Sequence, residues 1–251
     1  MVDFRHETQE KKGFKMRLLV AIPAFNEQYT IADVLHDVKE NLPKAQILVI
    51  NDGSTDETAA VVKSLNVPCL NFPFNMGVGA AMRAAFRFAK EENHSHVLQL
   101  DADGQHSAVE ALKLIASANE AEILIGSRFR DSSDYEVGKV RRLAMKTLAS
   151  VVGRRVGKKL TDVTSGFRLT GGSAIEFFSL NYPPEYLGDT VESILMAGKN
   201  GFKVEEVSVV MNERKGGQPS QNLYKLVVYL ARVVTVIVIS YIQYKKPRKI
   251  K

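Results

Sequence analysis

The chain has 251 residues, of which 45% are hydrophobic and 25% charged, so it can bury one sizeable core, or a core with an appendage, and it is neither disordered nor fibrous. Its single cysteine, Cys69, excludes a disulfide framework and a cysteine-based zinc site, which fits a reducing compartment. The net charge of +6 is unevenly placed: eight Lys or Arg without an acid lie within residues 139–159, and five more lie within 245–251.

Short apolar runs alternate with helical patterns over the first half of the chain. The runs are predicted strands because each is too short for a helix and ends in polar or small residues; they cover residues 17–22, 46–51, 96–101 and 122–127. Between them, apolar residues recur at helical spacing over residues 30–42, 56–65, 78–92 and 108–118. This alternation predicts an α/β fold with a mainly parallel sheet flanked by helices, whose ligands bind beyond the carboxyl ends of the strands.

The rhythm breaks after about residue 126. A polar stretch leads into the basic segment, and further on the pattern predicts a helix over 189–199 and a strand near 204–210. Residues 213–222 are rich in Gly, Ser and polar residues and predict a mobile loop. The polar and charged first 16 residues lead us to expect no secretory signal and a chain that faces the cytosol.

Acids dominate the ends of the predicted strands. Asp101, Asp103 and Gln105 follow one strand at every second position, so three oxygen-bearing side chains can converge on one cation. Such oxygens suit Mg²⁺ or Mn²⁺. Because Asp is also a common turn former, the pair by itself leaves a plain turn as the alternative.

Two other strand ends carry candidate nucleotide contacts. Asp52 ends a strand and is free to accept hydrogen bonds from a base or ribose, whereas Ser54 or Asp56 could simply cap the next helix. The Gly-rich run at 75–83 resembles a dinucleotide fingerprint, but Met82 stands at the place of its third glycine. The sequence therefore argues against a nicotinamide-dependent dehydrogenase.

Six motifs together carry a more specific resemblance. PAFNE, NDGSTDET, NMGVGAAMR, DADGQH, GSRF and TSGFR, in this order and at these distances, resemble the family 2 inverting glycosyltransferases of GT-A fold, and most closely the polyprenyl-phosphate sugar synthases. The resemblance covers roughly residues 17–222. It implies a nucleotide-sugar donor, a divalent cation (Mg²⁺ or Mn²⁺) and transfer of one sugar to a polyprenyl phosphate at the cytosolic face of a membrane.

The resemblance also implies residue roles. Asp101, Asp103 and Gln105 would hold the metal, and Asp52 would read the base. Arg214 would close over the pyrophosphate from a loop that departs from its relatives by an extra residue and a missing lysine. The implied substrate-binding residues are Pro23, Ala24, Asn26, Glu27, Asp52, Gly77, Asp101, Arg128, Gly166, Phe167 and Ser220, and the implied catalytic residues are Asp103, Arg168, Asp189, Glu192 and Arg214.

A catalytic base is the open point of this mechanism. Asp189 and Glu192 lie three apart on one face of a predicted helix, where relatives that glycosylate a hydroxyl keep a base. A phosphate acceptor needs none, because its second pKa of about 6 leaves the nucleophile ionised at pH 7. A catalytic role and a helix-start role both remain open for the two acids.

The last apolar run, residues 226–244, indicates membrane association. As a helix it would extend about 28 Å, close to the roughly 30 Å hydrocarbon thickness. Arg232 interrupts the run, however, and crossing would carry the basic tail outward against the positive-inside tendency. We therefore expect a catalytic domain at 1–222 and a peripheral or monotopic helix within 223–251, with a membrane-protein partner or a second copy left open.

The two basic clusters support the same location. They suggest contact with a membrane surface bearing anionic lipids, and they lack the interleaved aromatics that would favour nucleic acid. The alternatives are a solvated basic face, a glycosyltransferase acting on a sugar hydroxyl of a lipid-linked glycan, and a non-catalytic nucleotide-sensing membrane adaptor.

Overall fold

A computed structural model describes residues 16–130, 139–183 and 189–212, with the side chains of 139–144 left aside. Within these ranges the strands are β1 (Leu18–Ala24), β2 (Gln46–Asn51), β3 (Cys69–Asn71), β4 (His96–Gln99), β5 (Ile123–Ser127), β6 (Arg168–Gly171) and β7 (Val204–Ser208). The helices are α1 (Ile31–Asn41), α2 (Thr58–Ser64), α3 (Val78–Glu91), α4 (Ala108–Ala116), α5 (Lys139–Val156), α6 (Ser173–Asn181) and α7 (Asp189–Lys199).

The strands form one sheet in the order β3-β2-β1-β4-β6-β5-β7. All neighbouring pairs are parallel except those of β6, which runs antiparallel to both β4 and β5. The carboxyl ends of β1, β2, β4 and β5 therefore lie at the same edge of the sheet. The predicted mainly parallel α/β architecture is confirmed.

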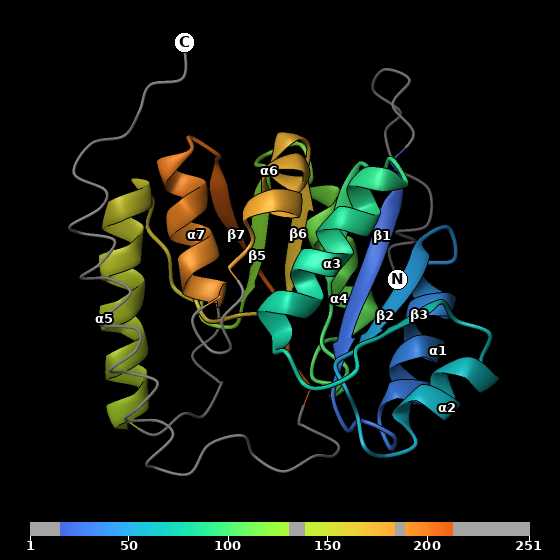
Figure 1. The fold of residues 1–251 in the computed structure, drawn as a ribbon. Coiled ribbons are helices and arrows are strands. Elements are labelled where there is room, and N and C mark those ends of the chain that lie inside the picture. The colour runs from blue at the N-terminus through green and yellow to red at the C-terminus, as the bar shows by residue number, and fades with distance from the viewer. Residues whose placement is uncertain (1–15, 131–138, 184–188, 213–251) are drawn as a thin grey trace, which may run out of the picture.

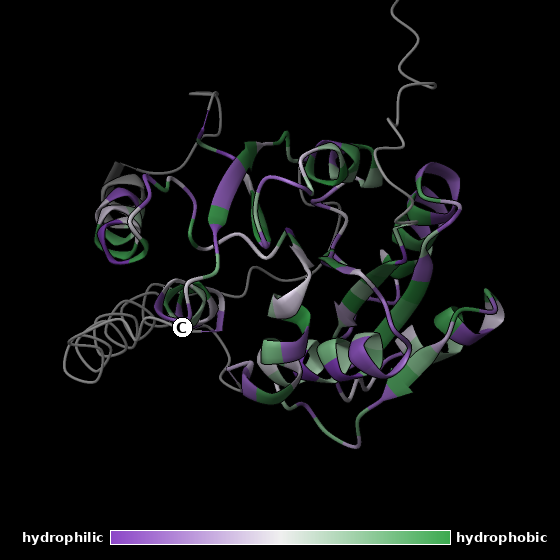
Figure 2. Cartoon of the chain, turned by 90° about the horizontal axis from the view of Figure 1, so that it is seen from above, coloured by the Kyte–Doolittle hydropathy of each residue, from purple (hydrophilic) through white to green (hydrophobic). Residues whose placement is uncertain are grey.

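Helices cover both faces of the sheet, and β1 shows how the sequence supports both layers. Leu19 and Ala21 belong to the core shared with α3, α5, α6 and α7, whereas Val20 and Ile22 belong to the core shared with α1, α2 and α4. A strand buried on both faces reads as a continuous apolar run, which is why 17–22 could be recognised. Figure 2 shows hydrophobic residues gathered on the strands and the helix faces turned toward them.

The predicted strands and helices of the first half and the predicted 189–199 helix are confirmed to within a few residues. The sequence analysis did not predict β3, β6, α5 or α6. Helix α5 lies at the edge of the molecule opposite α1 and α2 (Figure 1) and contains much of the basic segment. In the described part of the chain, no helix combines the length and apolarity that a membrane span requires; residues 226–244 lie outside that part.

Candidate active site at the carboxyl ends of the strands

The turns after β1 and β2 are linked by reciprocal hydrogen bonds. Asn26, in a left-handed conformation (φ 56°), donates its backbone N–H to Ser54 Oγ and accepts from the Thr55 N–H at 2.9 Å. Glu27 donates its backbone N–H to Thr58 Oγ1 at 2.9 Å. These bonds leave Asn26 exposed and Glu27 half-buried at the sheet edge, while Pro23 and Ala24 are buried in β1 itself.

Asp56 lies just before Glu57, the N-cap residue of α2, and accepts hydrogen bonds at the start of this helix. Its Oδ1 accepts bonds from the N–H and the hydroxyl of Thr58, the first residue of α2. Burial alone would raise the pKa of this carboxyl, but these bonds and one from the Gln28 N–H lower it. Asp56 thus belongs to the scaffold of the two turns.

Asp52 holds the loop that leads into α3. Its two carboxylate oxygens accept the backbone N–H groups of Met76 and Gly77 at 2.7 and 2.8 Å, and the residue is 3% exposed. Gly77 precedes α3 with φ 89°, a conformation that glycine adopts without strain. The Asp52 carboxylate, expected to read a base, therefore accepts hydrogen bonds from its own chain and fixes the loop before α3.

The acids after β4 lie against the segment that precedes β6. The Asp101 side chain is 37% exposed, and a Cβ built on Gly166 would lie 3.1 Å from both of its carboxylate oxygens. Asp103, also half-buried, accepts the backbone N–H of Gln105 at 3.0 Å. The structure thus brings Gly166 onto Asp101, two residues that are far apart in sequence.

The donor set is compatible with a hard cation that is completed by substrate oxygens. No three His, Cys, Asp or Glu side chains gather in a metal-binding arrangement within the described ranges. Asp101, Asp103 and the Gln105 amide supply oxygen ligands, and Mg²⁺ commonly uses one or two carboxylates together with substrate phosphates and water. The residues present therefore fit such an ion.

His106 and Phe167 form the floor beneath these acids. Their rings stack with centroids 4.7 Å apart, and both side chains are buried. His106 Nε2 lies 3.8 Å from an Asp101 oxygen, and burial lowers the pKa of His106 to about 4, so the ring is neutral at pH 7. The side chain of Phe167, named among the substrate-binding residues, packs in the core, and its backbone follows Gly166 at the site.

Arg128, which follows β5, is held in a two-pronged ion pair. Its Nε and Nη2 donate to the two carboxylate oxygens of Asp162, which is fully buried, and Nη2 also reaches Thr164 Oγ1 at 3.1 Å. Such a planar, bidentate pair fixes the guanidinium in one orientation. Sequence reasoning named Arg128 but missed Asp162, whose only signal was its place just ahead of TSGFR.

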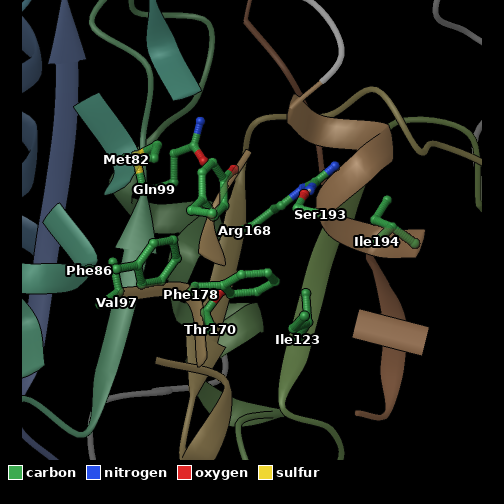
Figure 3. A pocket seen from close by; sticks show the side chains of 11 residues that line it. Met82, Phe86, Val97, Gln99, Ile123, Arg168, Thr170, Phe178, Ser193 and Ile194 are labelled. Atoms are coloured by element: carbon green, nitrogen blue, oxygen red, sulfur yellow. The ribbon is translucent and has the colours of Figure 1, made fainter. Parts of the chain in front are cut away.

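Arg168 is buried, and its side chain extends toward Ser193 of α7 (Figure 3). Its guanidinium donates to the Ser165 and Val163 carbonyls and, at 2.9 Å, to Ser193 Oγ. A small cavity beside it, about 10 Å³, has room for roughly one water molecule. Arg168, named among the catalytic residues, is thus 4% exposed and bonded to its own chain, and its catalytic role stays a prediction.

The two acids on α7 differ in exposure. Asp189 is 4% exposed, and its Oδ2 has no hydrogen-bond partner within the described residues. Burial raises its pKa to about 6, against the opposing effect of the Arg168 charge. Glu192 is half-buried one turn further along the helix. Of the remaining predicted site residues, Arg214 and Ser220 lie outside the described part of the chain.

The sequence model of a family described as "Glycosyl transferase family 2" matches residues 19–182. Among curated proteins, the chain is 29% identical over 210 residues to polyprenol monophosphomannose synthase of Mycolicibacterium smegmatis, covering 80% of this chain and 79% of the relative. It is 26% identical over 210 residues to undecaprenyl-phosphate mannosyltransferase of Micrococcus luteus, covering 81% and 86%.

A solved structure extends the comparison to the fold. Glucosyl-3-phosphoglycerate synthase from Mycobacterium tuberculosis, solved with Mn²⁺, uridine diphosphate and phosphoglyceric acid, is similar with a TM-score of 0.70. The sequences are 16% identical, and the match covers 89% of this chain and 78% of that chain. The similarity supports a GT-A-like fold for the chain.

Proposed function

The chain belongs to glycosyltransferase family 2, and we propose that it transfers a sugar, with inversion, from a nucleotide-sugar donor to a polyprenyl phosphate at the cytosolic face of a membrane. The observation that carries this proposal is the close approach of Gly166 to Asp101 in the turn after β4, at the carboxyl edge of the sheet. Two relatives support this acceptor class, because their names specify a polyprenyl-type phosphate and their matches cover 80% and 81% of the chain.

A divalent cation, Mg²⁺ or Mn²⁺, would be held by Asp101, Asp103 and Gln105. When bound, such an ion would act as a Lewis acid for the diphosphate leaving group. Asp101 and Asp103 are both partly exposed, so a cation could reach them from solvent, and the neutral His106 ring beneath Asp101 adds no competing positive charge. The solved neighbour that binds Mn²⁺ with uridine diphosphate has the same fold.

The remaining residues would bind and orient the substrates. The linked turns at Asn26 and Glu27 and the loop fixed by Asp52 form the donor side, whereas Gly166 allows the acceptor side to approach Asp101 closely. The guanidinium of Arg214 would donate hydrogen bonds to the diphosphate of the nucleotide sugar. Because a phosphate acceptor is ionised at pH 7, no side chain has to remove a proton from it.

Membrane contact completes the proposal. Residues 223–251 would attach the 1–222 catalytic domain to a surface with anionic lipids, and the basic 139–159 segment would add to this attraction. The competing enzyme function is transfer to a sugar hydroxyl of a lipid-linked glycan, for which Glu192, half-buried on α7, is the candidate base. A non-catalytic nucleotide-sensing adaptor would have no need for the Asp101 and Asp103 pair.

The proposed function is tested with polyprenyl phosphate and a panel of nucleotide sugars, by following release of nucleoside diphosphate. We expect a chelator to abolish release and Mn²⁺ or Mg²⁺ to restore it. Asp103→Asn should lower turnover by at least about a hundredfold, the scale of losing a principal electrostatic stabiliser. Asp33→Asn, which removes an exposed carboxylate from α1, is the control and should leave turnover intact. Full turnover in excess chelator would exclude the metal.

The acceptor class has its own test. Glu192→Gln should retain appreciable turnover with polyprenyl phosphate, and the rate should fall as the pH drops through about 6, following the acceptor phosphate. Thr190→Ser, a conservative change on the same turn, controls for disturbance of α7. If Glu192→Gln abolishes catalysis while donor binding and folding persist, a hydroxyl acceptor becomes the better explanation.

A further inference from the structure

A large groove lies along α5, separate from the acids after β4. Its volume is about 930 Å³, within the range of ligand sites. Apolar side chains of Phe129, Met145, Ala149 and Leu160 line its interior together with polar and basic ones. It is therefore an amphipathic groove, which we call the α5 groove.

The groove is built by a sharp return of the chain after α5. Gly157 adopts φ 72°, and the Lys158 N–H donates to the Gly153 carbonyl at 2.9 Å. A Cβ on Gly153 would lie 2.4 Å from the Lys158 carbonyl oxygen, so only glycine permits this packing. The return brings residues 157–161 alongside α5 and makes the groove part of the fold.

Positive charge is concentrated in this groove. Five of its lining residues are basic and none is acidic; the basic ones are Arg130, Lys146, Arg154, Lys158 and Lys159. The Lys158 ammonium is paired with Glu205 of β7. No acidic side chain in the described ranges pairs with Lys146, Arg154 or Lys159, all of which are exposed. Within the described ranges, the acidic partner of the groove's basic residues is therefore Glu205, which pairs with Lys158 alone among Lys146, Arg154, Lys158 and Lys159.

The position of the groove connects it with the candidate active site. Phe129 follows Arg128 directly, and Thr161 precedes Asp162, the partner of Arg128. The groove thus begins next to the carboxyl end of β5 and continues along α5, and this helix lies at the outer edge of the molecule in Figure 1. A membrane lipid bound here would hold this edge against the bilayer that supplies the acceptor.

We propose that the α5 groove is a discrete binding site for the headgroup of an anionic phospholipid, with its phosphate among Lys146, Arg154 and Lys159 and the start of its acyl chains against the apolar interior. The charge and the apolar lining together favour this occupant, since a free anion would leave the apolar surface unused. The inference rests on the proposed membrane location and deepens it from diffuse attraction to a specific lipid site.

The test compares full-length variants in co-sedimentation with vesicles of phosphatidylglycerol and phosphatidylcholine, without donor or acceptor. Arg154→Gln removes a groove charge, and Arg155→Gln removes the same charge from the neighbouring exposed position, which does not line the groove. We expect Arg154→Gln to weaken binding at least about fivefold more than Arg155→Gln does. Ser150→Trp, which fills the groove at an exposed position without changing charge, should weaken binding to a similar extent.

Diffuse attraction would give a different result. Each near-surface basic residue then contributes a similar share, so equal losses for Arg154→Gln and Arg155→Gln with no loss for Ser150→Trp would overturn the proposal. A soluble short-chain phosphatidylglycerol should also titrate the wild-type protein with one saturable site, and absence of saturation would count against it.

Catalytic assays separate this inference from the proposed function. With a short polyprenyl phosphate in detergent, Arg154→Gln should keep wild-type turnover. If it instead raises the KM for that acceptor while losing no more vesicle binding than Arg155→Gln does, the groove holds the acceptor and the phospholipid proposal fails. Vesicle binding needs no turnover, so an inactive enzyme would contradict the proposed function alone.

Discussion

Gly166 determines how closely the chain can approach the Asp101 carboxylate. The backbone of Gly166 takes the space of a side chain, since a Cβ there would lie 3.1 Å from both Asp101 oxygens and from Gln99 Nε2. Contacts this short force the neighbour to move by a few tenths of an ångström, and carboxylates in a reacting site tolerate little displacement. The glycine therefore matters for the chemistry more than for the core.

Gly166→Ala should accordingly impair catalysis more than folding. We expect turnover to fall roughly tenfold or more, because an Asp101 displaced even slightly orients the donor poorly. The melting temperature should fall by only a few degrees. Initial rates and calorimetric unfolding of the same preparation would check this, and unchanged turnover would show that the contact is unimportant.

Asp189 links the buried layer to pH. Its pKa rises from 3.8 to about 6 in the folded protein because burial disfavours the charged form. Between these values the unfolded chain is ionised while the folded chain remains protonated, so stability falls as pH rises from about 4 to 6 and stays lower above 6. The full effect is about 2 to 3 kcal/mol.

Asp189→Asn removes this titration. Urea unfolding at pH 4 and pH 7 should show the wild type losing stability relative to the variant by about 2 to 3 kcal/mol over that interval. Arg168 and Asp101, the charged groups that act on Asp189, remain in both proteins. A constant difference between the two proteins across the interval would mean that Asp189 is not titrating there.

Residue types alone could not distinguish ligands from scaffold in this site. Asp52 and Arg168 stand in motifs that resemble substrate-binding ones, yet both are buried and bonded to their own backbone. A carboxylate that accepts backbone N–H groups and one that accepts a ligand look the same in sequence. The positions after β4, by contrast, were predictable because parallel strands present their ends together.

At the scale of elements, β7 holds the segment that leads to Gly166. Glu206, 5% exposed, accepts the Thr161 N–H, the Thr161 hydroxyl and, at 2.7 Å, the Asp162 N–H. These bonds fix Asp162 opposite Arg128. One carboxylate thus satisfies two consecutive backbone donors that would otherwise be buried without partners.

Glu206→Gln should destabilise the fold by about 1 to 3 kcal/mol, because its amide nitrogen would face a buried donor. The adjacent Glu205→Gln is a matched control: Glu205 pairs with Lys158 and Lys203 nearer the surface, and such pairs contribute about 0 to 1 kcal/mol. Chemical denaturation of both variants would measure this. Equal effects of the two substitutions would contradict the role assigned to Glu206.

The elements that escaped prediction have physical reasons in common. Strand β3 has three residues, and β6 reads Arg-Leu-Thr-Gly, whose Arg and Thr side chains are buried although their residue types are polar. Because β6 inserts between β4 and β5 in the opposite direction, its place depends on non-local pairing. Helix α5 was not predicted because its many basic residues were interpreted as a charged surface segment and not as a helix.

For the whole molecule, the described residues up to Asn212 contain the sheet and helices on both of its faces. The two cores among these residues include side chains from Leu18 to Val209, which follows β7. The five basic residues of the tail and the apolar run 226–244 come later in the chain. Donor binding and membrane encounter should therefore depend on different parts of the protein.

A chain that ends at Asn222 tests this division. It retains Asp101, Asp103 and the described core, so we expect it to fold, to become soluble and to bind nucleotide sugar with metal. It should lose most turnover toward long-chain lipid in bilayers, because the apolar run and the tail charges, each worth about 1 kcal/mol near an anionic surface, are gone. Some salt-sensitive vesicle binding should remain, since the basic 139–159 segment is retained.

Calorimetry with the donor and vesicle co-sedimentation of the full-length and truncated chains would test this division. Equal sedimentation and equal lipid turnover would show that residues 223–251 are not the anchor, whereas loss of donor binding would show that they belong to the catalytic domain.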